Sequence, residues 1–414
     1  MRKCGVLLPV SAIPSQYGIG AFSREAYTFI DLLEEAGQSY WQILPLGPTG
    51  YGDSPYQSFS TFAGNPYYID LESLVQAGYL TEQDCEQYDF GDDDAYVDYE
   101  KIYLSRFKVL KKAFQNSQIE KDEAYQKFVE ENAYWLKDYA LYMAVKNAFG
   151  GKSWAEWDED IRLRKEEALK RYAEKYAEEV AFYQFQQYLF AKQWFALKAY
   201  ANQKKIEIIG DIPIYVAFDS SDTWANPELF QLDETLTPVA VAGCPPDAFS
   251  ATGQLWGNPL YRWDYHKETE YEWWMKRIAY CYKLYDVVRI DHFRGFDEYY
   301  SIPFGDETAE FGRWEKGPGY DIFQTMKAKL GKKAVIAEDL GFLTKSVINL
   351  VKKTGYPGMK ILQFAFDSRE ESDYLPHNYV ANSIVYTGTH DNDTTMGWYE
   401  KLNRRDKAFA KRYL

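Results

Sequence analysis

Seven short apolar runs recur along the chain, and most are separated by segments with helical periodicity. The runs span residues 5–10, 39–46, 206–216, 287–293, 334–340, 359–366 and 383–389. Several are almost continuously apolar, which is typical of parallel strands buried on both faces. Amphipathic segments such as 24–37 and 270–285 lie between them. This alternation predicts repeated βαβ units.

Two long segments interrupt the alternation. Residues 51–195 begin as a loop rich in Gly, Ser and Tyr and become helical and charged from about residue 99, whereas residues 217–265 have a loop-like, aromatic pattern. We predict a TIM-type (β/α)8 barrel formed by residues 1–50 and 196–414, with 51–195 as an inserted, mostly helical subdomain and 217–265 as an active-site loop insertion. Seven strands are one short of a closed barrel, so a doubly wound open sheet is the alternative fold.

Composition and charge limit the partners. The formal net charge is −15, and an acidic surface repels phosphate backbones and anionic membranes, so we expect neither nucleic acid nor membrane as a partner. Aromatic residues make up 18% of the chain, which suits either a large core or a surface that stacks on sugars. The four cysteines are far apart, and no segment resembles a signal peptide or a membrane span, which together predict a cytoplasmic protein.

Metal and phosphate chemistry find no support in the sequence. The four histidines show no ligand spacing such as H-E-x-x-H. The segment FGGKS at 149–153 imitates part of a P-loop, but Lys146 stands where the first glycine of that motif belongs. We therefore expect no metal and no cofactor.

Ionisable residues close three of the apolar runs. In VVRIDHF, Arg289 and Asp291 are two positions apart and share one face of a strand. In a barrel they would point toward the active-site mouth, and the arginine would favour the charged form of the aspartate. A structural ion pair that closes the strand is the plain alternative. Glu338 lies near the end of the run at 334–340, and Asp391 follows the run at 383–389.

These acids suit the chemistry of glycosidic bonds. The spacing places Asp291, Glu338 and Asp391 on the fourth, fifth and seventh strands of one mouth. Two carboxyl groups about 5 Å apart, one ionised and one protonated, cleave a glycosidic bond with retention. The ionised group attacks the anomeric carbon, and the protonated group donates to the leaving oxygen.

Longer motifs make a resemblance specific. They are YWQILPLGPTGYGDSPYQSFSTFAGNPYYIDL, GDIPIYVAFDSSDTWANPELF, GCPPDAFSATGQLWGNPLYRW, VVRIDHFRGF, VIAEDLG and YTGTHDNDTT. From end to end the chain resembles the 4-alpha-glucanotransferases (amylomaltases or disproportionating enzymes), the glycoside hydrolase family 77 branch of the α-amylase clan. The resemblance implies transfer of α-1,4-glucan segments to the 4-hydroxyl of an acceptor glucan or glucose by a retaining double displacement, with maltooligosaccharides and α-1,4-glucans as substrates.

The resemblance also implies roles for individual residues. Asp291 would be the nucleophile, Glu338 the general acid and base, and Asp391 the third carboxylate. Substrate-binding positions would be Tyr51, Tyr56, Asp211, Trp256, Asn258, Arg289, His292, Asp339 and His390. Two other functions stay open from the residues themselves: an α-amylase-type hydrolase with the same carboxylates, and a glucan-binding protein without turnover.

The chain departs from the family pattern in two places. Ala248 stands where some members have a tyrosine in the loop over the cleft, which puts one aromatic glucan contact in doubt. Family members continue past the T-H-D motif, so we expect the chain to lack their C-terminal segment. An unclosed sheet exposes strand edges, and the corresponding hypothesis is weak activity and a tendency to associate.

Overall fold

The fold is a parallel barrel-type sheet with helices around it, seen in a computed structural model of the chain. The structure describes residues 2–50, 52–93, 95–247, 250–341, 343–369 and 371–414. A five-stranded parallel sheet has the order β1-β2-β3-β6-β9, and β10 pairs with β11, also in parallel. The bounds are β1 Gly5–Leu7, β2 Tyr40–Gln42, β3 Glu207–Pro213, β6 Val287–Asp291, β9 Val335–Ala337, β10 Gly358–Ile361 and β11 Ser383–Tyr386.

All seven predicted strands are therefore present, each shorter than its apolar run. The backbone N–H of Ala337 donates to the carbonyl of Pro357 over 3.0 Å, which joins β9 to the start of β10. The spatial order follows the chain order without the reversal that a doubly wound sheet requires, so the strand order is that of a barrel. Across the sheet, the Tyr386 hydroxyl donates to Gln42 Oε1 over 2.7 Å and connects β11 with β2.

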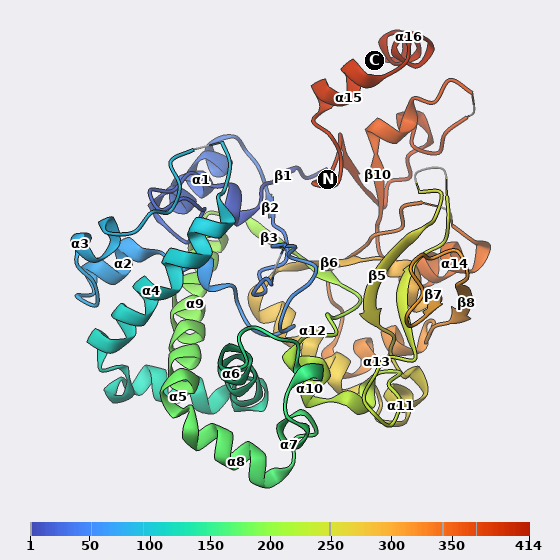
Figure 1. Cartoon of the computed structure of the whole chain (residues 1–414). Helices are drawn as coiled ribbons and strands as arrows, with labels where there is room; N and C mark the ends of the chain where they lie inside the picture. The colour runs from blue at the N-terminus through green and yellow to red at the C-terminus, as the bar shows by residue number, and fades with distance from the viewer. Residues whose placement is uncertain (1, 51, 94, 248–249, 342, 370) are drawn as a thin grey trace.

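Helices cover the outer face of this sheet (Figure 1). After β1 comes α1 (Arg24–Glu35), where 24–37 was predicted, and before β6 comes α12 (Glu272–Leu284), where 270–285 was predicted. The other helices of the barrel region are α11 Trp263–Glu268, α13 Asp321–Leu330, α14 Lys345–Thr354, α15 Thr395–Lys401 and α16 Arg404–Tyr413.

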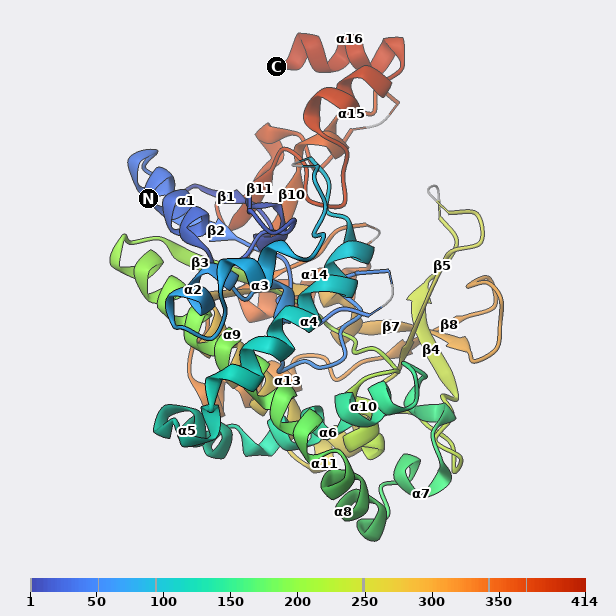
Figure 2. The ribbon, with the colours of Figure 1, turned by 60° about the vertical axis from the view of Figure 1, so that its left-hand side comes forward.

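The long segment between β2 and β3 is helical. It contains α2 Leu71–Gln76, α3 Glu82–Glu86, α4 Tyr99–Ser117, α5 Glu123–Glu131, α6 Ala133–Ala148, α7 Glu159–Arg162, α8 Glu166–Lys175 and α9 Ala177–Gln203. The boundary placed at residue 195 falls inside α9, because this 27-residue helix runs from the inserted helices back to the barrel (Figure 2). Its Trp194 is fully buried, and the indole N–H donates to the Leu284 carbonyl at the end of α12.

The segment at 217–265 contains more regular structure than the loop we predicted. It holds α10 (Ser221–Ala225) and the strands β4 (Ala240–Cys244) and β5 (Gln254–Pro259). These strands join β7 (Glu298–Pro303) and β8 (Arg313–Lys316) in an antiparallel sheet of order β5-β4-β7-β8. Small residues and a register shift between Val241 and Gly243 hide the strand pattern in the sequence. The sheet lies beside β6 (Figure 1), and its strand β5 contributes Trp256 and Asn258 to the lining of a cleft.

Candidate active site

The site is built at the carboxyl ends of β3 and β6, which pair in register so that Asp211 lies opposite Arg289. Arg289 Nη1 donates to both carboxylate oxygens of Asp211, over 2.8 and 2.6 Å. Its Nη2 lies 2.9 Å from Asp291 Oδ1. Asp211 and Arg289 are almost completely buried, whereas 30% of the Asp291 side chain is exposed. One guanidinium therefore serves two carboxylates, and only Asp291 reaches solvent.

The structure favours the protonated form of Asp291 more than the sequence suggested. The pKa of Asp291 is raised to about 7, mainly by burial; Asp211 and Glu338 contribute to the rise, and Arg289 opposes it. The expectation that Arg289 alone keeps Asp291 ionised is thus incomplete, because Asp211 takes two of the guanidinium's hydrogen bonds and adds a second negative charge. Asp291 and the neighbouring carboxyl of Glu338 share an environment in which two full charges are unfavourable.

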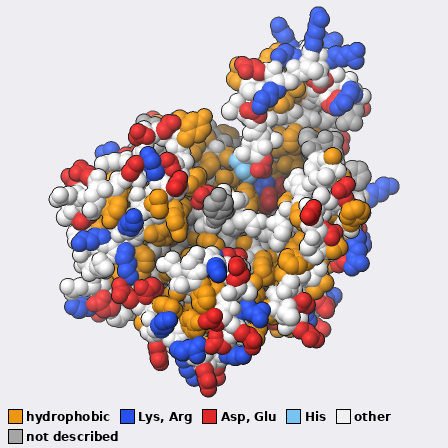
Figure 3. All heavy atoms as spheres, viewed as in Figure 1, with side chains coloured by type: hydrophobic (Ala, Val, Ile, Leu, Met, Phe, Trp, Pro, Cys, Tyr) orange, Lys and Arg blue, Asp and Glu red, His pale blue; other side chains and the backbone are white. Residues whose placement is uncertain are grey.

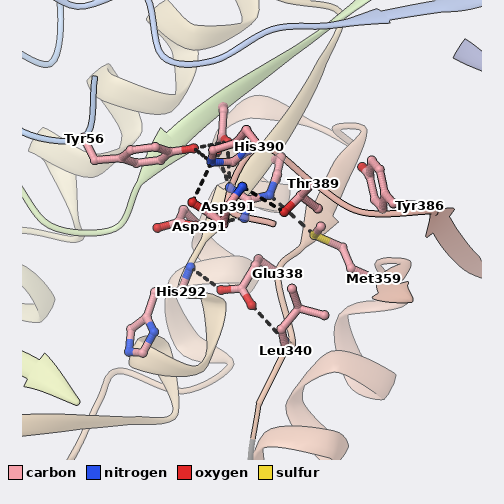
Figure 4. Close-up of polar contacts among 12 residues, drawn as sticks. Tyr56, Asp291, His292, Glu338, Leu340, Met359, Tyr386, Thr389, His390 and Asp391 are labelled. Carbon is pink, nitrogen blue, oxygen red and sulfur yellow. Dashed lines mark hydrogen bonds and ion pairs between the residues drawn. The ribbon is translucent and has the colours of Figure 1, made fainter. Parts of the chain in front are cut away.

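Glu338 follows β9 and faces the end of β6 (Figure 4). Its two oxygens accept backbone N–H groups, from His292 over 2.8 Å and from Leu340 over 2.8 Å. His292 adopts a left-handed conformation, with φ of 53°, as the chain turns after β6. Burial raises the pKa of Glu338, and the two amides and Arg289 oppose this rise.

A tyrosine joins the third acidic strand end to this centre. The Tyr56 hydroxyl donates to Asp211 Oδ2 over 2.9 Å and lies 2.7 Å from His390 Nε2. The two rings also stack, with centroids 5.6 Å apart. His390 Nε2 is 3.3 Å from Asp391 Oδ1, and 67% of the Asp391 side chain is exposed. Asp391 is therefore the most accessible of the three predicted catalytic carboxyl groups.

A cleft of about 280 Å³ opens beside these groups. Among the residues that line it are Asp291, Asp391 and four of the predicted substrate-binding residues, namely Tyr56, Trp256, Asn258 and His292. Figure 3 shows a hollow in the same face of the molecule, with acidic, basic and histidine side chains inside it.

Flat side chains shape the wall of the cleft. The Trp256 indole meets the His292 ring edge to face, with centroids 4.8 Å apart. Burial lowers the pKa of His292 to about 3, so its imidazole is neutral. The buried amide of Asn258 donates to the Val216 carbonyl and exchanges hydrogen bonds with Gln57, which fixes its orientation.

Asp339 lies in the segment between β9 and β10, next to Glu338. Its Oδ1 accepts the backbone N–H of Met359 over 2.7 Å at the start of β10. Tyr51 and Ala248 lie outside the described residues.

Sequence reasoning missed three residues of the site. Tyr215 and Gln57 line the cleft, and Met359 Sδ accepts Arg289 Nε over 3.4 Å. Tyr215 follows β3 within the motif GDIPIYV and was detectable from its place at a strand end. Met359 carried no signal, because a methionine in an apolar strand is normally part of the core.

Two negative findings concern the described part of the chain. Within it, no helix is both long and apolar enough to cross a bilayer. The same residues contain no group of three or more His, Cys, Asp or Glu side chains arranged to hold a metal ion.

Comparison with known proteins gives a consistent result. The family model for 4-alpha-glucanotransferase matches residues 8–414. A 4-alpha-glucanotransferase of Clostridium butyricum is 53% identical over 399 residues, covering 96% of this chain and 82% of that protein. One from Thermus thermophilus is 51% identical, covering 100% and 83%. The structure of amylomaltase from Streptococcus agalactiae in complex with acarbose superposes with a TM-score of 0.97 at 47% identity, covering 100% of this chain and 84% of that one.

Proposed function

The chain belongs to the 4-alpha-glucanotransferase family, and from this premise we propose that Asp291 and Glu338 carry out its reaction by a retaining double displacement. The observation that carries the proposal is the shared environment of the two carboxyl groups. Both pKa values are raised by burial, Arg289 is tied to Asp291, and Glu338 faces the same strand end. Two carboxyl groups that cannot both be charged are suited to divide the roles of nucleophile and acid.

In the first step Asp291 attacks the anomeric carbon of the donor glucan. Glu338 gives its proton to the glycosidic oxygen, the reducing-end fragment leaves, and a β-linked glycosyl-enzyme forms. In the second step Glu338 takes the proton of an acceptor 4-hydroxyl, whose oxygen attacks the anomeric carbon. The Asp291–carbon bond breaks, and an α-1,4 linkage is restored.

The proton must lie on Glu338 when the donor is bound. Both oxygens of Glu338 accept backbone N–H groups, which favours its charged form. Donation therefore requires one Glu338 oxygen to exchange its amide for the glycosidic oxygen. Arg289 assists by favouring the carboxylate form of Asp291.

Transfer requires that an acceptor sugar displace water from the glycosyl-enzyme. Tyr56 and Trp256, which are partly exposed, offer flat surfaces in the cleft on which a glucan can stack. We assign binding roles to these residues and to Asn258 and His292. Asp391, beside His390, is placed to hold sugar hydroxyls as the ring distorts.

The substrates we propose are maltooligosaccharides and longer α-1,4-glucans, and the cellular location we propose is the cytoplasm. The described cysteines are all unpaired, which agrees with a reducing compartment. We also propose a division into a barrel and an inserted helical unit, with α9 (Ala177–Gln203) shared between the two.

Incubation with maltotriose tests the proposal. Glucose together with a ladder of longer maltodextrins is the result expected of a transferase. Glucose and maltose alone would instead indicate hydrolysis, and binding without turnover would indicate a glucan-binding protein. Asp291→Asn serves as the control, because it should bind the sugar without forming products.

A further inference from the structure

The carboxylate of Asp339 packs closely against the backbone at the start of β10. Its Oδ1 accepts the N–H of Met359, and its carboxylate lies directly on Gly358. A Cβ atom added at Gly358 would be 2.2 Å from Asp339 Oδ2 and 2.6 Å from Cγ. Because φ at Gly358 is not positive, the close approach of the carboxylate is what requires a glycine there.

Met359, whose backbone is held by Asp339, also contacts Arg289 through its side chain. Its Sδ accepts Nε–H of Arg289 over 3.4 Å, and Met359 is 1% exposed. Arg289 in turn donates to Asp211 and pairs with Asp291. The sulfur thus receives the guanidinium donor that points away from both carboxylates. A planar guanidinium held at three points has one orientation, and a small rotation would lengthen its contact with Asp291.

The hydrogen bond between Asp339 and Met359 also restrains the turn that contains Glu338. Asp339 lies between Glu338 and Leu340, and the Leu340 N–H donates to Glu338 Oε1. Fixing Asp339 to β10 therefore restrains the backbone on both sides of the Leu340–Glu338 contact. Figure 4 shows the contact between Leu340 and Glu338, and a separate contact that ends on the sulfur of Met359.

We propose that Asp339 is a positioning residue, which acts through Met359 and Arg289 on Asp291 and through its own turn on Glu338, and does not bind sugar. This replaces the substrate-binding role that the sequence resemblance implied for Asp339. It rests on the proposed roles of Asp291 and Glu338.

Three substitutions test the pathway without altering either catalytic carboxyl group. Asp339→Ala removes the acceptor for the Met359 N–H. Gly358→Ala forces the carboxylate to move by about 1 Å, a displacement that can cost about 100-fold in rate when it reaches reacting groups. Met359→Leu preserves volume but removes the sulfur acceptor. For all three we expect kcat to fall at least about tenfold with KM changed less than about twofold, the division expected when an interaction made only in the transition state is lost.

The pH profile separates positioning from general damage. Loss of alignment between Arg289 and Asp291 should raise the acidic limb of kcat/KM by about one unit, because less of the guanidinium charge favours the aspartate anion. Asp339→Asn, whose amide oxygen can accept the same N–H, should recover most of what Asp339→Ala loses. The control is Ile361→Val, which trims the same apolar cluster on β10 and contacts none of these polar groups; it should leave the limb in place.

Titration of Asp291 itself, which does not depend on turnover, distinguishes the positioning role of Asp339 from the proposed catalytic roles. In protein labelled with ¹³C at the aspartate carboxyl carbon, the signal missing from Asp291→Asn identifies Asp291 and gives its pKa directly. We expect that pKa to rise in Met359→Leu and Gly358→Ala and to stay constant in Ile361→Val. An unchanged Asp291 pKa in both variants, or a raised KM with an unchanged pH profile in Asp339→Ala, would overturn the positioning role. If Asp291→Asn itself turned over substrate, the assignment of the nucleophile would fail while the titration still tested the pathway.

Discussion

Replacing Asp291 with asparagine should stabilise the folded protein at neutral and alkaline pH while it abolishes turnover. Asp291 is held near Asp211 and Glu338, and burial raises its pKa to about 7. The folded state therefore binds a proton at Asp291 up to about pH 7, whereas an unfolded aspartate releases it near pH 3.9, a typical value. Between these values the folded state holds more protons, so the free energy of unfolding falls as pH rises. Asparagine removes this dependence because it carries no charge at any pH.

The size of the effect follows from the same shift. Each pKa unit corresponds to about 1.4 kcal/mol, so a rise from about 4 to about 7 sets an upper limit of roughly 4 kcal/mol above pH 7. The side chain is 30% exposed, and solvent screening reduces this limit. We expect Asp291→Asn to gain about 1–3 kcal/mol at pH 8 and almost nothing at pH 4. The asparagine oxygen can still accept from Arg289, which also keeps its bidentate contact with Asp211.

Urea denaturation followed by tryptophan fluorescence, with circular dichroism as a second probe, measures this gain at pH 4, 6 and 8. The stability curves of parent and variant should diverge as pH rises through the interval from 4 to 7. A variant that is less stable than the parent at pH 8, or a difference that does not change with pH, would refute the reasoning about the buried charges.

Three further substitutions examine other parts of the site and fold. Glu338→Gln should lower kcat on maltotriose by about 10²–10⁴-fold, whereas the single-turnover burst of fluoride from α-glucosyl fluoride, which needs no proton, should fall much less. Tyr56→Phe should cost about 1–3 kcal/mol in urea denaturation, because the buried Asp211 loses a hydrogen bond of 2.9 Å. Lys146→Met should cost about 3–5 kcal/mol by the same measurement, since Lys146 is 7% exposed and pairs with Asp219.

Controls for these variants come from the same chain. Lys170→Met removes an exposed i,i+4 pair with Glu166 and should cost below about 0.5 kcal/mol. Equal losses for Lys146→Met and Lys170→Met would show that burial does not determine the cost. Equal losses of activity on both donors for Glu338→Gln would argue against its role as the acid.

The sequence predicted the strands well because buried parallel strands are continuous apolar runs. Each of the seven runs overlaps a strand of the five-stranded or the two-stranded parallel sheet, and the acids at their ends occupy one region of the fold. The antiparallel strands β4 and β5 were not predicted, because β4 is AVAGC, a short segment of small residues, and its register shifts at Gly243.

Contacts between distant residues lay beyond sequence reasoning. The Asp211–Arg289 pair follows from the register of β3 and β6, which the sequence does not specify. The effect of Arg289 on the pKa of Asp291 could not be predicted without knowing that Asp211 also contacts the guanidinium. The position of the Asp339 carboxylate on Gly358 depends on a turn whose geometry no periodicity reports.

The most direct test of the account is to identify the residue that becomes covalently linked to sugar. Glu338→Gln, supplied with α-glucosyl fluoride and no acceptor, should accumulate a glycosyl-enzyme, because the first step proceeds and the base for the second is missing. Mass spectrometry of the digested protein should then find one hexose on the peptide that contains Asp291, and none in the variant that also carries Asp291→Asn. A hexose on any other carboxyl group, or turnover by the double variant, would contradict the central claim.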